Sequence, residues 1–296
     1  MFKLQRRSPG EALFDYVNVI LMLAVCAITI YPIWYVLINS LNEGQDAMRG
    51  GIYWLPRKWS LSNYEAVFAN SGIMTAMWIT VAKTIVGTVL HVFFTAMVAY
   101  AFSRRELIGR QIYMTIGTIT LFFSGGLIPY YLLIRDMHLL DTFWVYVIPA
   151  LFSFFDLIIF LAFFRDLPAG LEEAAKIDGA DDFKIFYRVI IPISMPVVAT
   201  IALFHGVYQW NDYFSGVIFI NKNTELQPIQ TYLYRIVAQA SSNQIAAQAS
   251  GGITKTVTSQ SIKLATMVVT TLPIVFVYPF LQKYFVKGFM IGSIKG

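Results

Sequence analysis

Cysteine, charge and nucleotide-binding motifs are scarce in this sequence. Its 296 residues contain a single cysteine, Cys26, so a disulfide within the chain is impossible. Only 13% of the residues are charged, and no GxxxxGK[ST] phosphate loop occurs. Lys and Arg outnumber Asp and Glu by 22 to 17, but the bases are scattered between hydrophobic stretches instead of clustering, which argues against a nucleic-acid partner.

Hydrophobic residues are abundant: they make up 57% of the chain, and the mean hydropathy is +0.61. A chain this apolar is typical of a polytopic membrane protein. Because about 20 apolar residues cross the hydrocarbon core as a helix, we expect an all-α bundle of six transmembrane helices. The predicted spans are 16–38, 73–102, 112–134, 142–164, 186–210 and 262–284.

The segments between these spans predict the topology. We expect a short head (1–15) and one membrane domain (16–296), with outer loops at 39–72 and 211–261 and an inner loop at 165–185. The inner segments hold thirteen Lys and Arg residues, against eight in the longer outer loops. Basic residues favour the cytoplasmic side, so both termini are predicted there. The first run ends at Tyr31-Pro32-Ile33-Trp34-Tyr35 without a small-x-small cleavage site, which predicts a retained helix.

Ionisable residues inside the predicted spans need partners or an exit to water. We expect Lys83 and His91 to face the interior of the bundle. Lys83 is expected to extend its ammonium toward the outer interface, and His91 to be a hydrogen-bonded packing residue. Prolines at 192 and 196 predict a kink in the fifth span.

The inner loop is the most charged stretch between two apolar runs. Pro168 can begin a short helix, Asp178-Gly179 can end it, and Asp181 or Asp182 can cap the next one. The pattern alone leaves two interpretations open. The short helix either packs on its own bundle or on lipid headgroups, or it docks into a groove of a soluble partner.

The segment Glu173-Ala-Ala-Lys-Ile-Asp-Gly179, followed by Pro192, resembles the EAA-x-x-x-G loop of the membrane permease subunits of bacterial ABC importers. The fuller pattern LEEAAKIDGA…F…IIPISMP is similar to the MalG-like permeases that import carbohydrates. Further similar segments are Tyr100–Arg104 with Gly109-Arg110, Trp210–Tyr213 and 292–296. The stretch Leu226-Gln-Pro-Ile-Gln230 resembles a subgroup linked to oligosaccharides of plant cell-wall type.

This resemblance implies a type I importer permease in the bacterial cytoplasmic membrane. Two such subunits would form a heterodimer around the pathway, two cytoplasmic ATPases would hold ATP and Mg, and an extracytoplasmic solute-binding protein would deliver the carbohydrate. This chain would then bind no cofactor or metal and would not be an enzyme.

The resemblance also assigns residues. Those implied to contact the ATPase are Glu172, Glu173, Ala174, Ala175, Asp178, Gly179, Ala180 and Pro192, with the tail residues Ser293, Ile294, Lys295 and Gly296. The alternative for the tail is that it makes no ordered contact with the ATPase. Candidates for sugar contact are Asp156, Trp210, Asn211 and Asp212, because sugar sites combine aromatic faces with carboxylates and amides. Asp156 could equally bind a neighbouring helix, and Asp212 could cap a helix end.

Two other classes of membrane protein would also account for some of these residues. An ion-coupled secondary transporter could use Lys83, Asp156 and His205, but it would not need a docking helix. An intramembrane hydrolase would need Phe123-Ser-Gly-Gly126 to act with one of the histidines 91, 138 and 205. That serine lacks the preceding Gly-x of a nucleophile motif.

Overall fold

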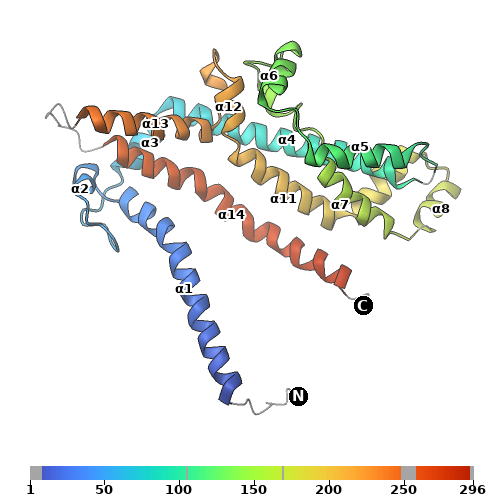
Figure 1. Cartoon of the computed structure of the whole chain (residues 1–296), viewed down its shortest axis with the longest axis horizontal. Coiled ribbons are helices and arrows are strands. Elements are labelled where there is room, and N and C mark those ends of the chain that lie inside the picture. Colours follow the sequence, from blue (N-terminus) through green and yellow to red (C-terminus); the bar gives the residue numbers. More distant parts are fainter. Residues whose placement is uncertain (1–8, 105, 169, 248–257, 294–296) are drawn as a thin grey trace. The chain divides into compact units, whose positions relative to one another are not determined.

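The computed structural model describes residues 9–104, 106–168, 170–247 and 258–293. Every regular element in these ranges is helical (Figure 1). In chain order they are α1 (Pro9–Ser40), α2 (Gly44–Met48), α3 (Ser62–Ala69), α4 (Ser71–Ser103), α5 (Arg110–Phe122), α6 (Leu127–Asp136), η1 (Phe143–Tyr146), α7 (Phe154–Arg165), α8 (Gly170–Ile177), α9 (Asp182–Ile185), the π-helix η2 (Phe186–Ile190), α10 (Ile191–Ile193), α11 (Met195–Asn211), α12 (Phe214–Phe219), η3 (Thr224–Leu226), α13 (Ile229–Ala247) and α14 (Ser259–Ser293).

The chain divides into two compact units. The first comprises Met1–Asn70 and Ile236–Val269, and the second comprises Ser71–Arg235 and Thr270–Gly296. Three helical stretches of the described residues are long and apolar enough to cross a membrane: α1, α4 and residues 260–277 of α14. Two bent helix pairs raise the possible total to five. The all-α membrane class is therefore confirmed, and the expected count of six spans is not confirmed by the described residues.

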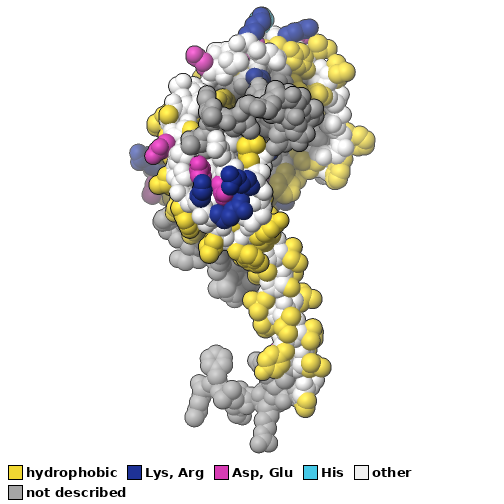
Figure 2. Space-filling view, turned by 90° about the vertical axis from the view of Figure 1, so that its left-hand side faces the viewer, with side chains coloured by type: hydrophobic (Ala, Val, Ile, Leu, Met, Phe, Trp, Pro, Cys, Tyr) yellow, Lys and Arg dark blue, Asp and Glu magenta, His cyan; other side chains and the backbone are white. Residues whose placement is uncertain are grey.

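In the first unit, α1 is covered with exposed hydrophobic side chains, which Figure 2 shows along the helix. Such a surface suits lipid or a partner helix. The loop after α1 is organised by Asp46, which accepts hydrogen bonds from Asn42 Nδ2 and Arg57 Nε at 3.0 Å each. The hydrogen bond from Asn42, followed by that from Arg57, lowers the pKa of Asp46. The predicted outer loop 39–72 contains a second short helix, α3.

In the second unit, α4 is the central helix, with α11 and α7 packed along it (Figure 1). Ala96 and Ala99 are fully buried at this contact, and small residues allow helices in membranes to approach closely. They pack in a core with the side chains Leu157, Phe160, Phe186 and Ile201. The apolar side of α4 thus lies against two helices at once.

The predicted third span is broken. Helices α5 and α6 meet at an angle of 117°, and the break contains Gly125-Gly126. Gly126 has φ +84°, a left-handed value that favours glycine. We expected an interruption here, but the two halves are bent too far apart to form one straight helix.

The predicted fourth span, 142–164, is wrong as a continuous helix, because helical structure resumes only at α7. The preceding residues form η1, and Val145, Tyr146 and Val147 are buried in a second core with Phe219 and Ile220. This segment is also held by Asp141, whose Oδ1 accepts backbone N–H groups of residues 221, 222 and 223 at 2.7, 2.6 and 3.3 Å. Burial raises the pKa of Asp141, but these three hydrogen bonds outweigh it and the pKa is lowered.

The predicted fifth span contains a sharp bend, as its prolines indicated. The run α9–η2–α10 and helix α11 meet at 83°, with Ser194 at the junction between Pro192 and Pro196. The predicted outer loop 211–261 is largely helical in its described part, where α12, η3 and α13 lie. Residues 248–257 of that loop lie outside the described residues.

Gly117 makes the contact between α5 and α7 possible. A Cβ placed on Gly117 would overlap the ring of Phe154, which is buried. We predict that Gly117→Ala lowers the stability of the detergent-solubilised protein by about 1–3 kcal/mol, the usual cost of overpacking a core. Thermal unfolding measures this. Gly206→Ala is the matched control, because its nearest neighbour, Thr88 Oγ1, would be 3.6 Å away. Equal melting temperatures for the two variants would contradict the prediction.

Candidate functional site

The charged inner loop folds as its sequence indicates. Helix α8 ends where Gly179 takes φ +75° and its N–H donates to Lys176 O at 3.0 Å. Asp181 is the residue that caps α9, because its Oδ1 accepts the N–H of Lys184 at 2.7 Å. Both terminators predicted from the residue types are therefore confirmed, and they fix a short helix between two turns.

The two sides of α8 meet different surroundings. Ala175 and Ala180 pack against the core that contains Ile185 and Phe186. Glu173 and Ile177 face outward, and the side chain of Ile177 is 86% exposed. An isoleucine left so exposed beside acidic residues is suited to contact with another protein. The helix thus has one attached side and one available side.

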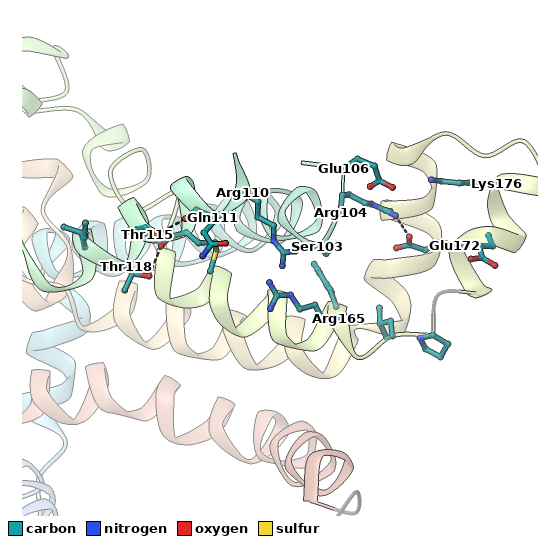
Figure 3. A pocket seen from close by; sticks show the side chains of 16 residues that line it. Ser103, Arg104, Glu106, Arg110, Gln111, Thr115, Thr118, Arg165, Glu172 and Lys176 are labelled. Carbon is teal, nitrogen blue, oxygen red and sulfur yellow. Dashed lines mark hydrogen bonds and ion pairs between the residues drawn. The ribbon is translucent and has the colours of Figure 1, made fainter. Parts of the chain in front are cut away.

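Glu172 joins α8 to the end of α4. Its Oε2 forms an ion pair with Arg104 Nη1, and the guanidinium of Arg104 also lies 4.0 Å from the centre of the Tyr100 ring. Sequence reasoning noted 100–104 only as a family-like segment and missed this contact. Figure 3 shows Arg104, Arg110 and Arg165 around one cavity, with Glu172 on the side of α8. The cavity has a volume of about 1270 Å³.

The remaining predicted ATPase contacts are placed as follows. Ala174 and Asp178 are exposed on and just after α8, and Pro192 lies in α10, beyond the π-helix. Of the tail, Ser293 is the last residue of α14. Ile294, Lys295 and Gly296 lie outside the described residues.

Lys83 faces the interior of the bundle, as expected, but its ammonium does not reach water, so the expected extension to the outer interface is wrong. Its side chain is fully buried, and Nζ lies 3.1 Å from Asp212 Oδ2 and 3.0 Å from Asp212 O. The ammonium also lies 4.8 Å from the centre of the Tyr146 ring. Asp212 Oδ1 accepts the N–H of Ser215 at 3.0 Å, which confirms a helix-capping role. A buried lysine inside lipid needs such a partner, and Asp212 provides it.

Asp156 joins two histidines from different helices. Its Oδ2 lies 2.9 Å from His91 Nε2, and the rings of His91 and His205 stack with centroids 3.7 Å apart. His91 Nδ1 lies 2.7 Å from Ala150 O, so the packing role expected for His91 is confirmed. The cluster ties α4, α7 and α11 together around polar groups.

Trp210 and Asn211 form hydrogen bonds with carbonyl groups of the same chain. Trp210 is buried and donates from Nε1 to Thr270 O at 3.1 Å, and Asn211 Nδ2 donates to Val207 O at 2.8 Å. Of the four candidate sugar contacts, Asp156 lines a cavity of about 420 Å³. Asp156 and His205, which were proposed for an ion-coupled transporter, lie close together. The third such residue, Lys83, forms an ion pair with Asp212 instead.

These features define a helical membrane protein with an exposed amphipathic helix between two of its membrane segments. The sequence profile of the family described as "Binding-protein-dependent transport system inner membrane component" matches residues 6–291. The chain belongs to this family, as the EAA-like loop predicted.

Two proteins of Bacillus subtilis (strain 168) are similar over nearly the whole chain. Protein LplC is 38% identical over 96% of this chain and 95% of its own length. The "Polygalacturonan/rhamnogalacturonan transport system permease protein YtcP" is 37% identical over 96% and 99%. A chain of a crystal structure of a bacterial ABC transporter involved in the import of alginate matches with a TM-score of 0.86, at 29% identity, covering 95% of this chain and 99% of that one.

The ion pair Lys83–Asp212 can be tested by a double-mutant cycle. We predict that Lys83→Met destabilises the protein by about 3–5 kcal/mol, because the largely enclosed side chain of Asp212, 9% exposed, is left without a counter-charge. Adding Asp212→Asn to that variant removes the stranded charge and recovers most of the loss. Thermal unfolding in detergent is the measurement, with the exposed Lys184→Met as the control. If the double variant were no more stable than the single one, the pair would not be coupled.

Proposed function

We propose that this chain is a permease subunit of an ATP-driven importer that carries an oligosaccharide into the cell. Membership of the family supports this, since its description names binding-protein-dependent transport. The similar proteins support a carbohydrate substrate, because they include polygalacturonan/rhamnogalacturonan and arabinooligosaccharide permeases. Together with the 226–230 stretch, these names favour saccharides derived from plant cell walls.

The observation that carries the proposal is the form of α8. It is a short helix with Glu173 and Ile177 exposed, ended by the turn at Gly179, and it is attached to the bundle through Ala175 and Glu172. A helix that only covered its own bundle would bury its large apolar side chain. We infer that a cytoplasmic ATPase receives this exposed side and that ATP and Mg are bound there.

The assembly follows from this assignment. One chain would form half of the pathway, and a second homologous permease would complete a heterodimer. Two ATPases would dock on the α8 side, and an extracytoplasmic binding protein would deliver the sugar from the opposite side. The excess of Lys and Arg in 1–15, 103–111, 165–188 and the tail supports a cytoplasmic location for those segments and both termini.

The direct test uses the complete transporter. The chain is co-expressed with the second permease, the ATPase and the binding protein encoded beside it, and the complex is purified and reconstituted in liposomes. We expect the four proteins to co-purify and saccharide-loaded binding protein to stimulate ATP hydrolysis. Uptake that survives loss of the ATPase and collapses with an uncoupler would instead indicate ion coupling.

The coupling role of α8 makes a prediction for two substitutions. Glu173→Lys reverses a charge on the exposed side, and Gly179→Pro cannot adopt φ +75° because proline fixes φ near −65°. Both variants should insert and fold, yet lose stimulated ATP hydrolysis and uptake almost completely. Glu225→Lys, which alters an exposed acid outside the loop, should behave like the wild type. Normal transport by both loop variants would contradict the coupling role.

The ion pair between Arg104 and Glu172 should set how firmly α8 is attached. Arg104→Met removes a charged, partly buried hydrogen bond, so we predict that uptake per ATP hydrolysed falls about threefold. The exchanged pair Arg104→Glu with Glu172→Arg should recover part of the loss, because opposite charges face each other again. The measurement is the ratio of saccharide imported to phosphate released. An unchanged ratio in Arg104→Met would show that the pair contributes to neither attachment nor coupling.

A further inference from the structure

A smaller cavity, of about 420 Å³, lies beside the cluster of Asp156 and the two histidines. Its polar groups come from His91, Asp156 and His205, and its aromatic walls include Phe155, Phe204 and Tyr208. Asp156 precedes the end of α7 at Arg165 by nine residues, a rise of about 14 Å, which is near half of a hydrocarbon core about 30 Å thick. The cavity thus lies about halfway along the distance that a membrane-crossing helix must span.

The hydrogen bonds of His91 show that a hydrogen lies between His91 Nε2 and Asp156 Oδ2. Ala150 O can only accept, so His91 Nδ1 must carry a hydrogen. Nε2 then faces the carboxyl group of Asp156 in one of two ways: as part of an imidazolium beside a carboxylate, or as an acceptor from a protonated acid. Either form of the pair is neutral overall. Both nitrogens of His91 are also occupied, which leaves no lone pair for a metal ion without breaking one of these bonds.

His205 offers a donor to the cavity. Gln209 Nε2 donates to Tyr146 O at 2.9 Å, so its second hydrogen points to His205 Nε2 at 3.3 Å. An imidazole that accepts at Nε2 is neutral and carries its hydrogen on Nδ1. Among the described residues Nδ1 has no hydrogen-bond partner, although His205 is 6% exposed and lines the cavity. A donor that lines a cavity without a protein acceptor can be met by an acceptor group of a ligand.

The composition of the wall selects the kind of ligand. Aromatic faces with a few fixed polar groups are typical of small-molecule sites, and the flat C–H face of a sugar ring packs on such faces. None of the ten lining residues is Lys or Arg, and the one carboxyl group, Asp156, is already paired with His91. A uronate carboxylate would enter without a counter-charge, whereas a hydroxyl can accept from His205 and donate to Asp156.

We propose that this cavity contacts one neutral sugar unit of the transported oligosaccharide. The unit packs on Phe155, Phe204 and the ring of Tyr208, and its hydroxyls bond His205 Nδ1, the free oxygen of Asp156 and the hydroxyl of Tyr208. This inference rests on the proposed function, because it assumes a saccharide in the pathway. Beyond that function, the inference states that the contacted sugar unit is neutral and names the residues that contact it.

The test follows import of a mixture by the reconstituted transporter. Proteoliposomes containing the complete complex receive neutral arabinotriose and raffinose together with acidic trigalacturonate, and mass spectrometry measures each inside the vesicles. The variants are Tyr208→Phe and Phe155→Ala, which alter exposed side chains of the wall and spare the buried cluster. Tyr113→Phe and Phe123→Ala are matched controls on exposed aromatics outside the wall. ATP hydrolysis stimulated by the loaded binding protein is recorded in parallel.

We expect both wall variants to import the neutral saccharides about fivefold more slowly, the effect of losing one hydrogen bond or one packing face, while stimulated ATP hydrolysis stays within about twofold of the wild type. The controls should match the wild type in both measurements.

Variants that import like the controls would overturn the cavity assignment and leave the importer intact. A wild type that imports trigalacturonate alone, with the variants slowing it, would overturn the neutral class. If Zn²⁺ blocked import and His205→Ala relieved the block, the cluster would be a metal site. A wild type with neither import nor stimulated hydrolysis would refute the proposed function itself.

Discussion

The requirement that buried ionisable groups be paired governs the second unit of this protein. Helix α4 carries Lys83 and His91 into an apolar interior, where an unpaired charge is costly. Lys83 meets Asp212 just after α11, and His91 meets Asp156 at the start of α7. The two pairs therefore fix the register of both neighbouring helices on α4, and hydrophobic packing between them completes the contact. Apolar surfaces alone would allow these helices to slide, since lipid solvates them equally well.

Sequence patterns predicted the structure correctly where residues close together in the chain determine it. Gly179 and Asp181 predicted the end of α8 and the start of α9 correctly, because capping and left-handed turns involve residues a few positions apart. Contacts between distant residues were not predictable in this way. The fourth span was expected as one helix because its residues are apolar, but Asp141 binds backbone groups 80 residues away and the following segment packs on Phe219 and Ile220. The partner of Lys83, 129 residues along the chain, was missed for the same reason.

The proposed functions of the two sites are physically linked through α4. Its last turn holds Arg104, which binds the attached side of α8, and its middle holds His91, which stacks on His205 beside the small cavity. A single stiff helix thus joins the surface proposed for the ATPase to the cluster proposed for the sugar. The helix α8 itself has few contacts of its own, so its position depends on Ala175, Ala180 and the Arg104–Glu172 pair.

The 83° bend at Ser194 has a mechanical consequence. The arm made of α9, η2 and α10 leaves α11 nearly at a right angle, and it follows directly after α8 in the chain. A sideways displacement of that arm acts on α11 as a torque about its long axis, whereas a straight span would be pushed along its length. Rotation of α11 would carry His205 and Gln209 together and slide the His205 ring off His91. The bend therefore converts lateral movement at one end of the helix into a change in the lining of the cavity.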